Sequence, residues 1–223
     1  MHSRNDNREN TEEKINLVYS RPEEIEQQSF AIIEKELPFA IPEDIKPVVK
    51  RVIHTTADFS YAETLYFSEN VMDIAHEAIR GGAVFITDTN MGKAGINKAR
   101  LKPYECQVQC FMADEDVALQ ASERGVTRAV VSMEKAACIK DRPLIFAIGN
   151  APTALIRLYE LIKEEKVHPA LIIGVPVGFV NVVESKELIL KAGVPCIVAR
   201  GRKGGSNVAS AICNALVLSM HDR

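Results

Sequence analysis

Short apolar runs alternate with amphipathic segments over the last third of the chain. Three uninterrupted apolar runs have the length of buried strands, at 144–148, 170–173 and 196–199. Each leads through a glycine-containing turn into a segment with helical spacing, and we expect these helices at 153–166, 184–192 and 206–220. Strands that are apolar throughout and separated by helices are typical of a parallel sheet covered on both faces. The pattern therefore predicts an α/β fold with a mostly parallel sheet and helices on both faces.

The first two thirds continue this alternation less clearly. Further helices are expected at 69–80, 116–124 and 127–139, with Gly125 as a C-cap. A short apolar strand at 83–87 ends on Asp88, and the polar alternation at 106–111 is typical of an edge strand.

Two helices are expected near the N-terminus. The first opens at Ser20 and Glu23, which have capping-box spacing. The second covers about 44–53 and has an apolar face made of Ile45, Val48, Val49 and Val52.

The bulk composition fits one domain. The chain has 223 residues, of which 47% are hydrophobic, and it has no repeat or low-complexity linker. We expect residues 1–18 to form a polar, disordered tail and residues 19–223 to form the α/β domain. No apolar run is long enough to span a membrane, and the start lacks a signal-peptide core.

Charge and cysteine usage narrow the class of protein. The net charge of −3 argues against general nucleic-acid binding. The cysteines are odd in number and form no CxxC pair, and those in apolar runs are expected to be buried thiols: Cys106, Cys110, Cys196 and Cys213. A reducing cytoplasm is therefore the expected location.

Polar or glycine-rich loops follow four of the predicted strands. They cover 88–91, 149–152, 174–178 and 200–207. Ligands of open parallel sheets bind beyond the carboxyl ends of the strands, so these loops are candidates for a site. The last contains three cations and three glycines, which suits carboxylate or phosphate, although most basic loops of this kind are simply solvated turns. It has no Walker sequence, and no GxGxxG follows the first strand.

His54 is the best-placed histidine for proton transfer. It follows the second helix, near Arg51 on the helical wheel and ahead of a Thr-Thr pair. A solvated pair at a helix end explains the same pattern about as well. Ser29 interrupts the apolar stripe of the first helix, where a tolerated serine is the favoured interpretation. No metal-ligand spacing and no GxSxG sequence is present.

Six segments together resemble the precorrin-8X methylmutase family. They are Arg51–Asp58 (RVIHTTAD), Thr87–Met91 (TDTNM), Gly149–Leu155 (GNAPTAL), Gly174–Val180 (GVPVGFV), Glu184–Lys186 (ESK) and Gly201–Asn207 (GRKGGSN). The resemblance runs in order from about Pro22 to the C-terminus, which makes it specific.

The resemblance implies an isomerase of cobalamin biosynthesis. Such enzymes move a methyl group from C-11 to C-12 of a corrin precursor and yield hydrogenobyrinate or cobyrinate. The HTTAD and TDTNM versions are more similar to the branch that acts on cobalt-precorrin-8. The resemblance further implies a homodimer with its site near the subunit interface, a tetrapyrrole ligand and no resident cofactor, since any cobalt belongs to the substrate.

The family's catalytic histidine matches His54, and its substrate-contacting residues match Ser29, Arg51 and, on a shorter pattern, Arg128. We expect the strand-end loops to contribute further substrate contacts, from Thr89, Asn90, Met91, Asn150, Arg202, Lys203, Gly204, Gly205 and Ser206. A methyl shift within a conjugated ring needs no covalent nucleophile. It needs a fixed ring and a proton placed near ring C. His54 would supply that proton, and such acid–base catalysis would accelerate the reaction by about two to four orders of magnitude.

Two alternatives remain open from the sequence. A corrin-binding carrier would hold the ring without changing it. A phosphate-binding α/β transferase would use 200–207 as its phosphate loop, although the missing nucleotide fingerprints argue against it.

Overall fold

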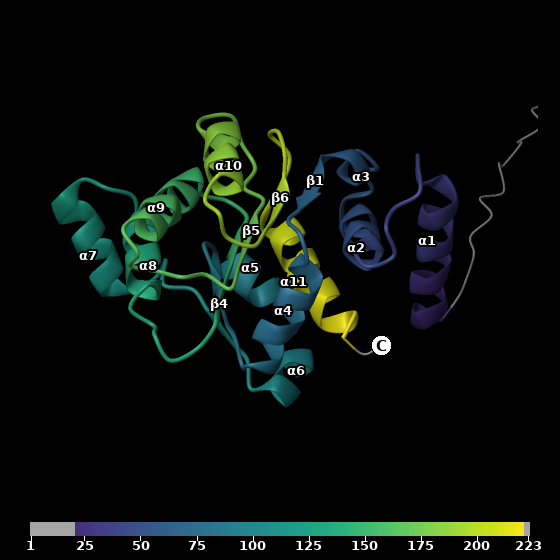
Figure 1. Cartoon of the computed structure of the whole chain (residues 1–223), viewed down its shortest axis with the longest axis horizontal. Helices are drawn as coiled ribbons and strands as arrows, with labels where there is room; N and C mark the ends of the chain where they lie inside the picture. Colours follow the sequence, from purple (N-terminus) through teal and green to yellow (C-terminus); the bar gives the residue numbers. More distant parts are fainter. Residues whose placement is uncertain (1–20, 221–223) are drawn as a thin grey trace, which may run out of the picture.

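The computed structural model describes residues 21–220, so Ser20 and the predicted tail at 1–18 lie outside the described residues. Within this range the strands form one six-stranded sheet in the order β1-β6-β5-β4-β2-β3 (Figure 1). The strands are β1 (Leu65–Phe67), β2 (Val84–Thr87), β3 (Gln107–Gln109), β4 (Leu144–Ile148), β5 (Leu171–Gly174) and β6 (Cys196–Ala199). All neighbouring pairs are parallel except β1 with β6, which confirms the predicted mostly parallel sheet.

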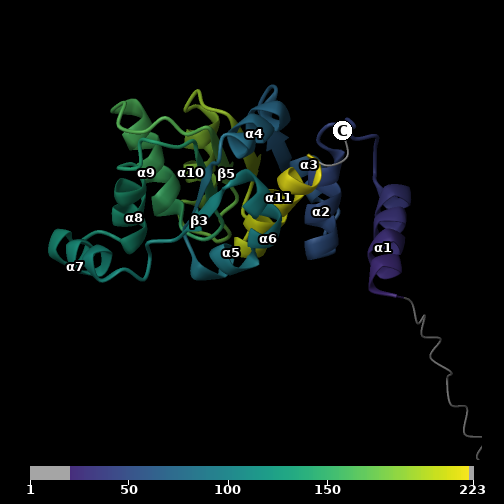
Figure 2. The same cartoon turned by 90° about the horizontal axis from the view of Figure 1, so that it is seen from below.

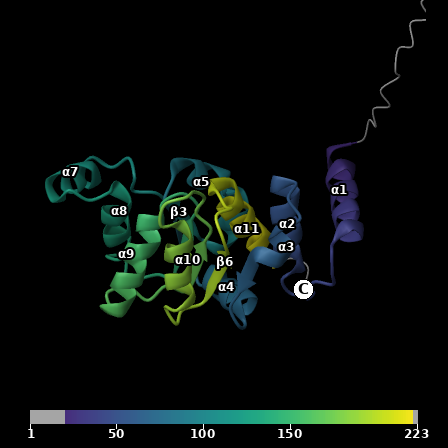
Figure 3. The same ribbon diagram turned by 90° about the horizontal axis from the view of Figure 1, so that it is seen from above.

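Helices cover both faces of the sheet, as the apolar strands predict. The longer helices are α1 (Pro22–Glu36), α2 (Lys46–Thr56), α4 (Val71–Arg80), α7 (Glu115–Arg124), α8 (Arg128–Ala136), α9 (Pro152–Lys163), α10 (Val182–Leu190) and α11 (Ser206–Leu218). One core cluster joins α2, α4 and α11 to the sheet, and another joins α8, α9 and α10 to its opposite face. Seen from below and above, α1 and α7 lie at opposite ends of the molecule (Figures 2 and 3).

The short elements were not predicted. They are β1 and the helices α3 (Tyr61–Thr64), α5 (Asn90–Gly95) and α6 (Lys98–Leu101). Segments of three to six residues carry too few positions to display a period. β1 pairs with β6 through Leu65↔Ala199 and so closes the edge of the sheet next to α2.

The second helix is longer than predicted. It runs to Thr56 rather than ending at Ile53, and Ala57 terminates it in the left-handed conformation (φ 52°). The Thr56 hydroxyl donates to the Val52 carbonyl at 2.8 Å, which helps threonine fit the last turn. His54 therefore lies within the helix and not after it.

Two burial predictions need correction. The apolar stripe predicted for the first helix consists of Ile25, Ile32 and Ile33. Ile33 is buried, but Ile25 and Ile32 are 51% and 56% exposed, so α2 covers only part of the stripe. Cys106 is half-buried because it lies next to the edge strand β3, whereas Cys110, Cys196 and Cys213 are buried as predicted.

A buried carboxylate connects the carboxyl ends of β2 and β4. Asp88 is 1% exposed and accepts backbone N–H groups from Gly149 (3.0 Å), Asn150 (2.8 Å) and Ala151 (2.6 Å). Burial raises the pKa of the Asp88 carboxyl above its usual range, while the three donors act in the opposite direction. The position of the turn after β4 therefore depends on a side chain that follows β2.

We expect Asp88→Asn to destabilise the fold by about 2–4 kcal/mol, because an amide has one acceptor oxygen and leaves a buried N–H unpaired. Chemical denaturation of both proteins measures this difference. The matched control is Asp141→Asn at an exposed position, which should change the free energy of unfolding by less than about 0.5 kcal/mol. Equal stability of Asp88→Asn and wild type would contradict the role assigned to Asp88.

Candidate active site

The last two turns of α2 present Arg51 and His54 three residues apart, on the side opposite the buried valines. His54 is exposed and Arg51 is half-buried. Arg51 Nη1 forms a short ion pair with Glu26 Oε1 of α1. The structure therefore confirms that Arg51 and His54 share one helix face, and it gives Arg51 a carboxylate partner that the sequence did not indicate.

Phe30 of α1 connects the two predicted residues of α2. Its ring lies 5.2 Å from the His54 ring, centroid to centroid, and 4.7 Å from the Arg51 guanidinium carbon. Ser29, beside Phe30, is half-buried and donates its hydroxyl to the Ile25 carbonyl at 2.8 Å. The structure thus brings Ser29, Arg51 and His54 into one region where α1 meets α2.

Sequence reasoning missed Phe30 and Glu26. Both contacts cross from one helix to another, so no spacing within either helix reveals them. The available signal was an aromatic residue next to Ser29 in α1.

The loops after β2 and β6 meet at the carboxyl edge of the sheet. Thr89 caps α5 by accepting the Gly92 N–H at 2.9 Å, and its hydroxyl lies 2.7 Å from the Ser206 hydroxyl. Asn90 and Met91 follow in the first turn of α5, and both are exposed. The Thr89–Ser206 contact brings together two loop residues that the sequence singled out.

Glycine is required in the loop after β6, because its backbone packs against the loop after β5. The Gly205 N–H donates to the Val175 carbonyl at 2.9 Å. A Cβ atom on Gly204 would lie 2.0 Å from the same carbonyl oxygen, which no side chain can tolerate. The glycines of this loop therefore allow close contact between two loops of the protein.

Arg202 and Lys203 of this loop face different neighbours. Lys203 Nζ contacts Asp58 Oδ2 at 2.5 Å and Ser60 Oγ at 2.9 Å, beyond the end of α2. The Lys203 ammonium, with Ser60, lowers the pKa of the Asp58 carboxyl. The Arg202 guanidinium lies 5.6 Å from the centre of the exposed Phe179 ring. The Lys203–Asp58 contact links the loop after β6 to the segment that carries His54.

A buried lysine supports the loop from the side of α10. Lys186 is fully buried, and its ammonium donates to the Gly201 carbonyl at 2.7 Å and to the Lys203 carbonyl at 2.9 Å. Burial lowers the pKa of Lys186 to about 8. Lys186 belongs to the family segment Glu184–Lys186, but its spacing gave no indication of this contact.

A cavity of about 530 Å³ opens between α1 and α2 on one side and α5 and α11 on the other. Arg51, Thr55 and Met91 line it, together with Asn207 and Ser210 of α11. His54 lies next to Thr55 on the chain. The volume lies within the usual range for small-molecule sites.

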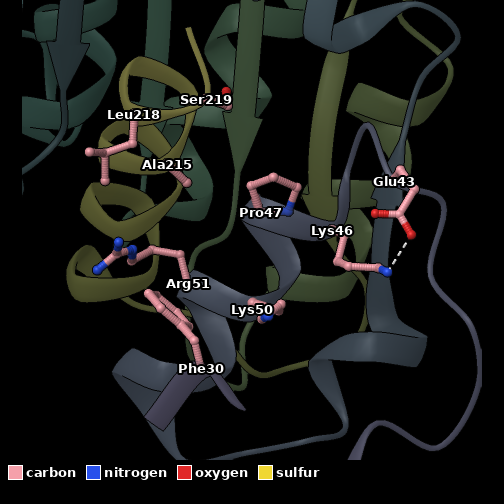
Figure 4. Close-up of a pocket in the computed structure, with 9 residues that line it drawn as sticks. All are labelled: Phe30, Glu43, Lys46, Pro47, Lys50, Arg51, Ala215, Leu218 and Ser219. Carbon is pink, nitrogen blue, oxygen red and sulfur yellow. Dashed lines mark hydrogen bonds and ion pairs between the residues drawn. The ribbon is translucent and has the colours of Figure 1, made fainter. Parts of the chain in front are cut away.

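A second cavity of about 320 Å³ lies between α2 and α11 (Figure 4). Arg51 lines both cavities, and Figure 4 shows its side chain between Phe30 and the end of α11. Lys46 and Lys50 also line the second cavity, and both form ion pairs with Glu34 of α1. The cations along this face of α2 are thus partly neutralised by carboxylates of α1.

Arg128 lies away from this region, whereas Asn150 follows Gly149, which packs against Gly205 and Ser206. Arg128 is the first residue of α8 and is exposed, and Figures 1–3 all show α8 and α2 on opposite flanks of the sheet. Asn150 donates its N–H to Asp88, and its side chain is exposed. One copy of the chain therefore does not bring Arg128 to His54.

Across residues 21–220, no group of three or more His, Cys, Asp or Glu side chains is placed to hold a metal ion. No helix in that range has the length and apolarity needed to cross a membrane.

The fold and site define an α/β protein with a cationic, glycine-rich edge beside a histidine that faces solvent. The family model for precorrin-8X methylmutase matches residues 24–219, and the chain belongs to this family. It is a methylmutase of cobalamin biosynthesis and therefore an isomerase.

Individual relatives agree with the family match. The chain is 43% identical over 202 residues to the cobalt-precorrin-8 methylmutase of Leptospira interrogans, covering 87% of this chain and 92% of that protein. It is 43% identical to that of Priestia megaterium, with 88% and 87% covered. A crystal structure of precorrin-8x methyl mutase from Thermus thermophilus has a TM-score of 0.81 and 36% identity, with 89% of this chain and 98% of that chain covered.

The lowered pKa of Lys186 predicts how stability depends on pH. Between pH 8 and 10.5 the folded chain loses a proton that the unfolded chain still holds, so folding becomes more favourable as the pH rises through this window. Relative to Lys186→Met, we expect the free energy of unfolding of the wild type to gain about 1–2 kcal/mol from pH 7 to pH 10.

Chemical denaturation at both pH values measures this gain. The exposed Lys191, next after α10, provides the control, because Lys191→Met should follow the wild type at both pH values. A gain of zero, or a loss, relative to Lys186→Met would contradict the prediction.

Proposed function

We propose that the chain moves a methyl group from C-11 to C-12 of cobalt-precorrin-8, giving cobyrinate, with His54 as the proton donor or acceptor. The observation that carries this proposal is the position of His54, which faces solvent on α2 beside a cavity that Arg51 and Thr55 line. Relatives named cobalt-precorrin-8 methylmutase support the cobalt form of the substrate, at 43%, 43% and 39% identity. A relative from Pseudomonas aeruginosa, 39% identical, is named precorrin-8X methylmutase. The metal-free ring is therefore the competing substrate.

The substrate is a broad apolar ring with carboxylates around its rim, and the site offers matching groups. Arg51, Arg202 and Lys203 would pair with the carboxylates, while Met91 and Phe30 would contact the ring. Thr89, Asn90, Asn150 and the Gly204–Ser206 backbone would complete the polar contacts. The methyl group migrates within the ring, so the atoms of the substrate and product are the same and no group is carried by the protein.

His54 would act on the ring and not on the methyl group. A proton given to the conjugated system, or a hydrogen bond to it, changes the distribution of charge as the methyl group moves. The neighbouring Phe30 ring limits the orientations of the imidazole. Ser29 would orient the substrate from α1, and any cobalt arrives with the substrate.

Arg51 would exchange partners when the substrate binds. Its guanidinium pairs with Glu26 in the free chain, and Glu26 lines the same cavity. A substrate carboxylate would replace Glu26 as the partner of Arg51. Because one ion pair replaces another, the desolvation of the arginine would change little.

The same proposal includes a homodimer in which the active site takes residues from two copies. Arg128 lies on the opposite flank from His54 in one copy, so a ligand that contacts both requires a second copy. Ile25 and Ile32 of α1 are more than half exposed and would be covered by the partner. We place the enzyme in the cytoplasm because its five cysteines are all unpaired.

Replacing His54 by alanine should slow the methyl shift by about two to four orders of magnitude, because the proton donor is lost. An anaerobic absorbance time course with cobalt-precorrin-8, followed by mass analysis, measures the rate, since the shift changes the chromophore and not the mass. His168→Ala is the control, because His168 is exposed in a loop that precedes β5.

Three results would argue against this proposal. A wild-type rate in His54→Ala would exclude proton transfer by the imidazole. A constant spectrum with ligand bound to the wild type would favour a corrin carrier. Turnover of metal-free precorrin-8X alone would assign the metal-free substrate.

Mixing two inactive variants tests the shared site. His54→Ala and Arg128→Ala should each be strongly slowed, yet co-refolded dimers containing one of each retain one intact site. Random pairing should then restore about one quarter of the wild-type activity. If the mixture is no more active than its components, Arg128 and His54 do not act together across two copies.

A further inference from the structure

Lys186 carries a buried ammonium group that donates to two backbone carbonyls. It is 0% exposed, and it lies on the face of α10 that packs against β5 and β6. In the described part of the chain no carboxylate lies within ion-pair distance of its Nζ. Its hydrogen bonds go to the carbonyls of Gly201 and Lys203, at 2.7 and 2.9 Å.

Burying an ammonium without a counter-ion has a free-energy cost, which an apolar side chain of similar length would avoid. A methionine in this position could fill the same space. Stability alone therefore does not explain a lysine here. What lysine adds is a set of donors that reach two carbonyls of one loop.

The two carbonyls lie on either side of Arg202. Fixing both limits the rotation of the peptide groups that set the direction of the Arg202 and Lys203 side chains. Gly201 lies just before them in a left-handed conformation (φ 78°), which an ordinary residue rarely adopts and which therefore needs support from its neighbours.

The other connections to this loop reach it from different sides. The Gly178 N–H donates to the Arg202 carbonyl at 3.2 Å, and Lys203 pairs with Asp58 at its outer end. Lys186 approaches from the protein interior, so its two bonds hold the loop against the sheet even when Lys203 leaves Asp58 for a ligand.

We propose that Lys186 is a positioning residue for substrate binding, which holds the 200–205 backbone so that Arg202 and Lys203 present their charges to the substrate carboxylates. This inference rests on the proposed function, in which those two side chains contact the substrate. Lys186 itself does not touch the substrate.

Kinetics of Lys186→Met with cobalt-precorrin-8 test the proposal. We expect KM to rise about tenfold, because a charge-assisted contact with the substrate would be misplaced. The value of kcat should change less than about twofold. Lys191→Met, the same substitution at an exposed position after α10, should keep both constants. Wild-type KM in a folded Lys186→Met would overturn the proposal, and so would a loss confined to kcat.

A double-mutant cycle separates positioning through the loop from a general structural role. Arg202→Ala/Lys203→Ala should raise KM by itself, and adding Lys186→Met should then raise it little further, because the groups it positions are gone. If Lys186→Met raises KM by the same factor with and without the loop substitutions, the two effects are independent, and the proposal is overturned.

The same cycle distinguishes failure of the inference from failure of the proposed function. If Arg202→Ala/Lys203→Ala raises KM and Lys186→Met does not, only the inference fails. If the loop variant keeps the wild-type KM, the substrate contacts of the proposed function fail and the inference falls with them. Should Lys186→Met not fold, Lys186→Gln, which can donate to fewer carbonyls, should raise KM, and an unchanged KM would overturn the proposal.

Discussion

Backbone groups crowd together at the carboxyl edge of the sheet, and two buried charges of opposite sign satisfy them. The Asp88 carboxylate accepts three N–H groups after β4, and the Lys186 ammonium donates to two carbonyls after β6. Both charged side chains are buried, so each would be costly without its partners. The turn and the loop also touch, since a Cβ atom on Gly149 would lie 2.7 Å from the Gly205 carbonyl oxygen. The geometry of the whole binding edge depends on these two side chains.

Hydrophobic periodicity predicted the sheet because its strands are buried on both faces. β4 and β6 have the predicted bounds, and the edge strand near Val108 was recognised from its polar alternation. Helix ends were harder to place, because they depend on local backbone conformation. The left-handed Ala57 ends α2 three residues later than predicted, and alanine gives no signal for that conformation. The antiparallel β1 is defined by its pairing with β6 and not by its own three residues.

The sequence predicted the parts of the candidate site that lie at strand ends or in motifs. It did not predict the parts that arise from packing between distant elements. The contact between Thr89 and Ser206 arises because parallel strands end at one edge. The contacts of Phe30 with His54 and of Lys186 with the 200–205 loop join elements that are distant in sequence. Ser29 and Arg128 were selected through the family resemblance, since spacing alone favoured an unremarkable serine and gave no reason to single out that arginine.

The cations of α2 show why binding would be an exchange of partners. Arg51, Lys46 and Lys50 already pair with Glu26 and Glu34 of α1, and the chain carries a net charge of −3. A substrate rich in carboxylates therefore gains little from long-range attraction and must compete with α1 at short range. α1 is also held by few buried contacts, with Ile33 buried while Ile25 and Ile32 are exposed. Competition for the cations and incomplete burial of α1 act on the same helix, so occupancy of the site and the position of α1 should be coupled.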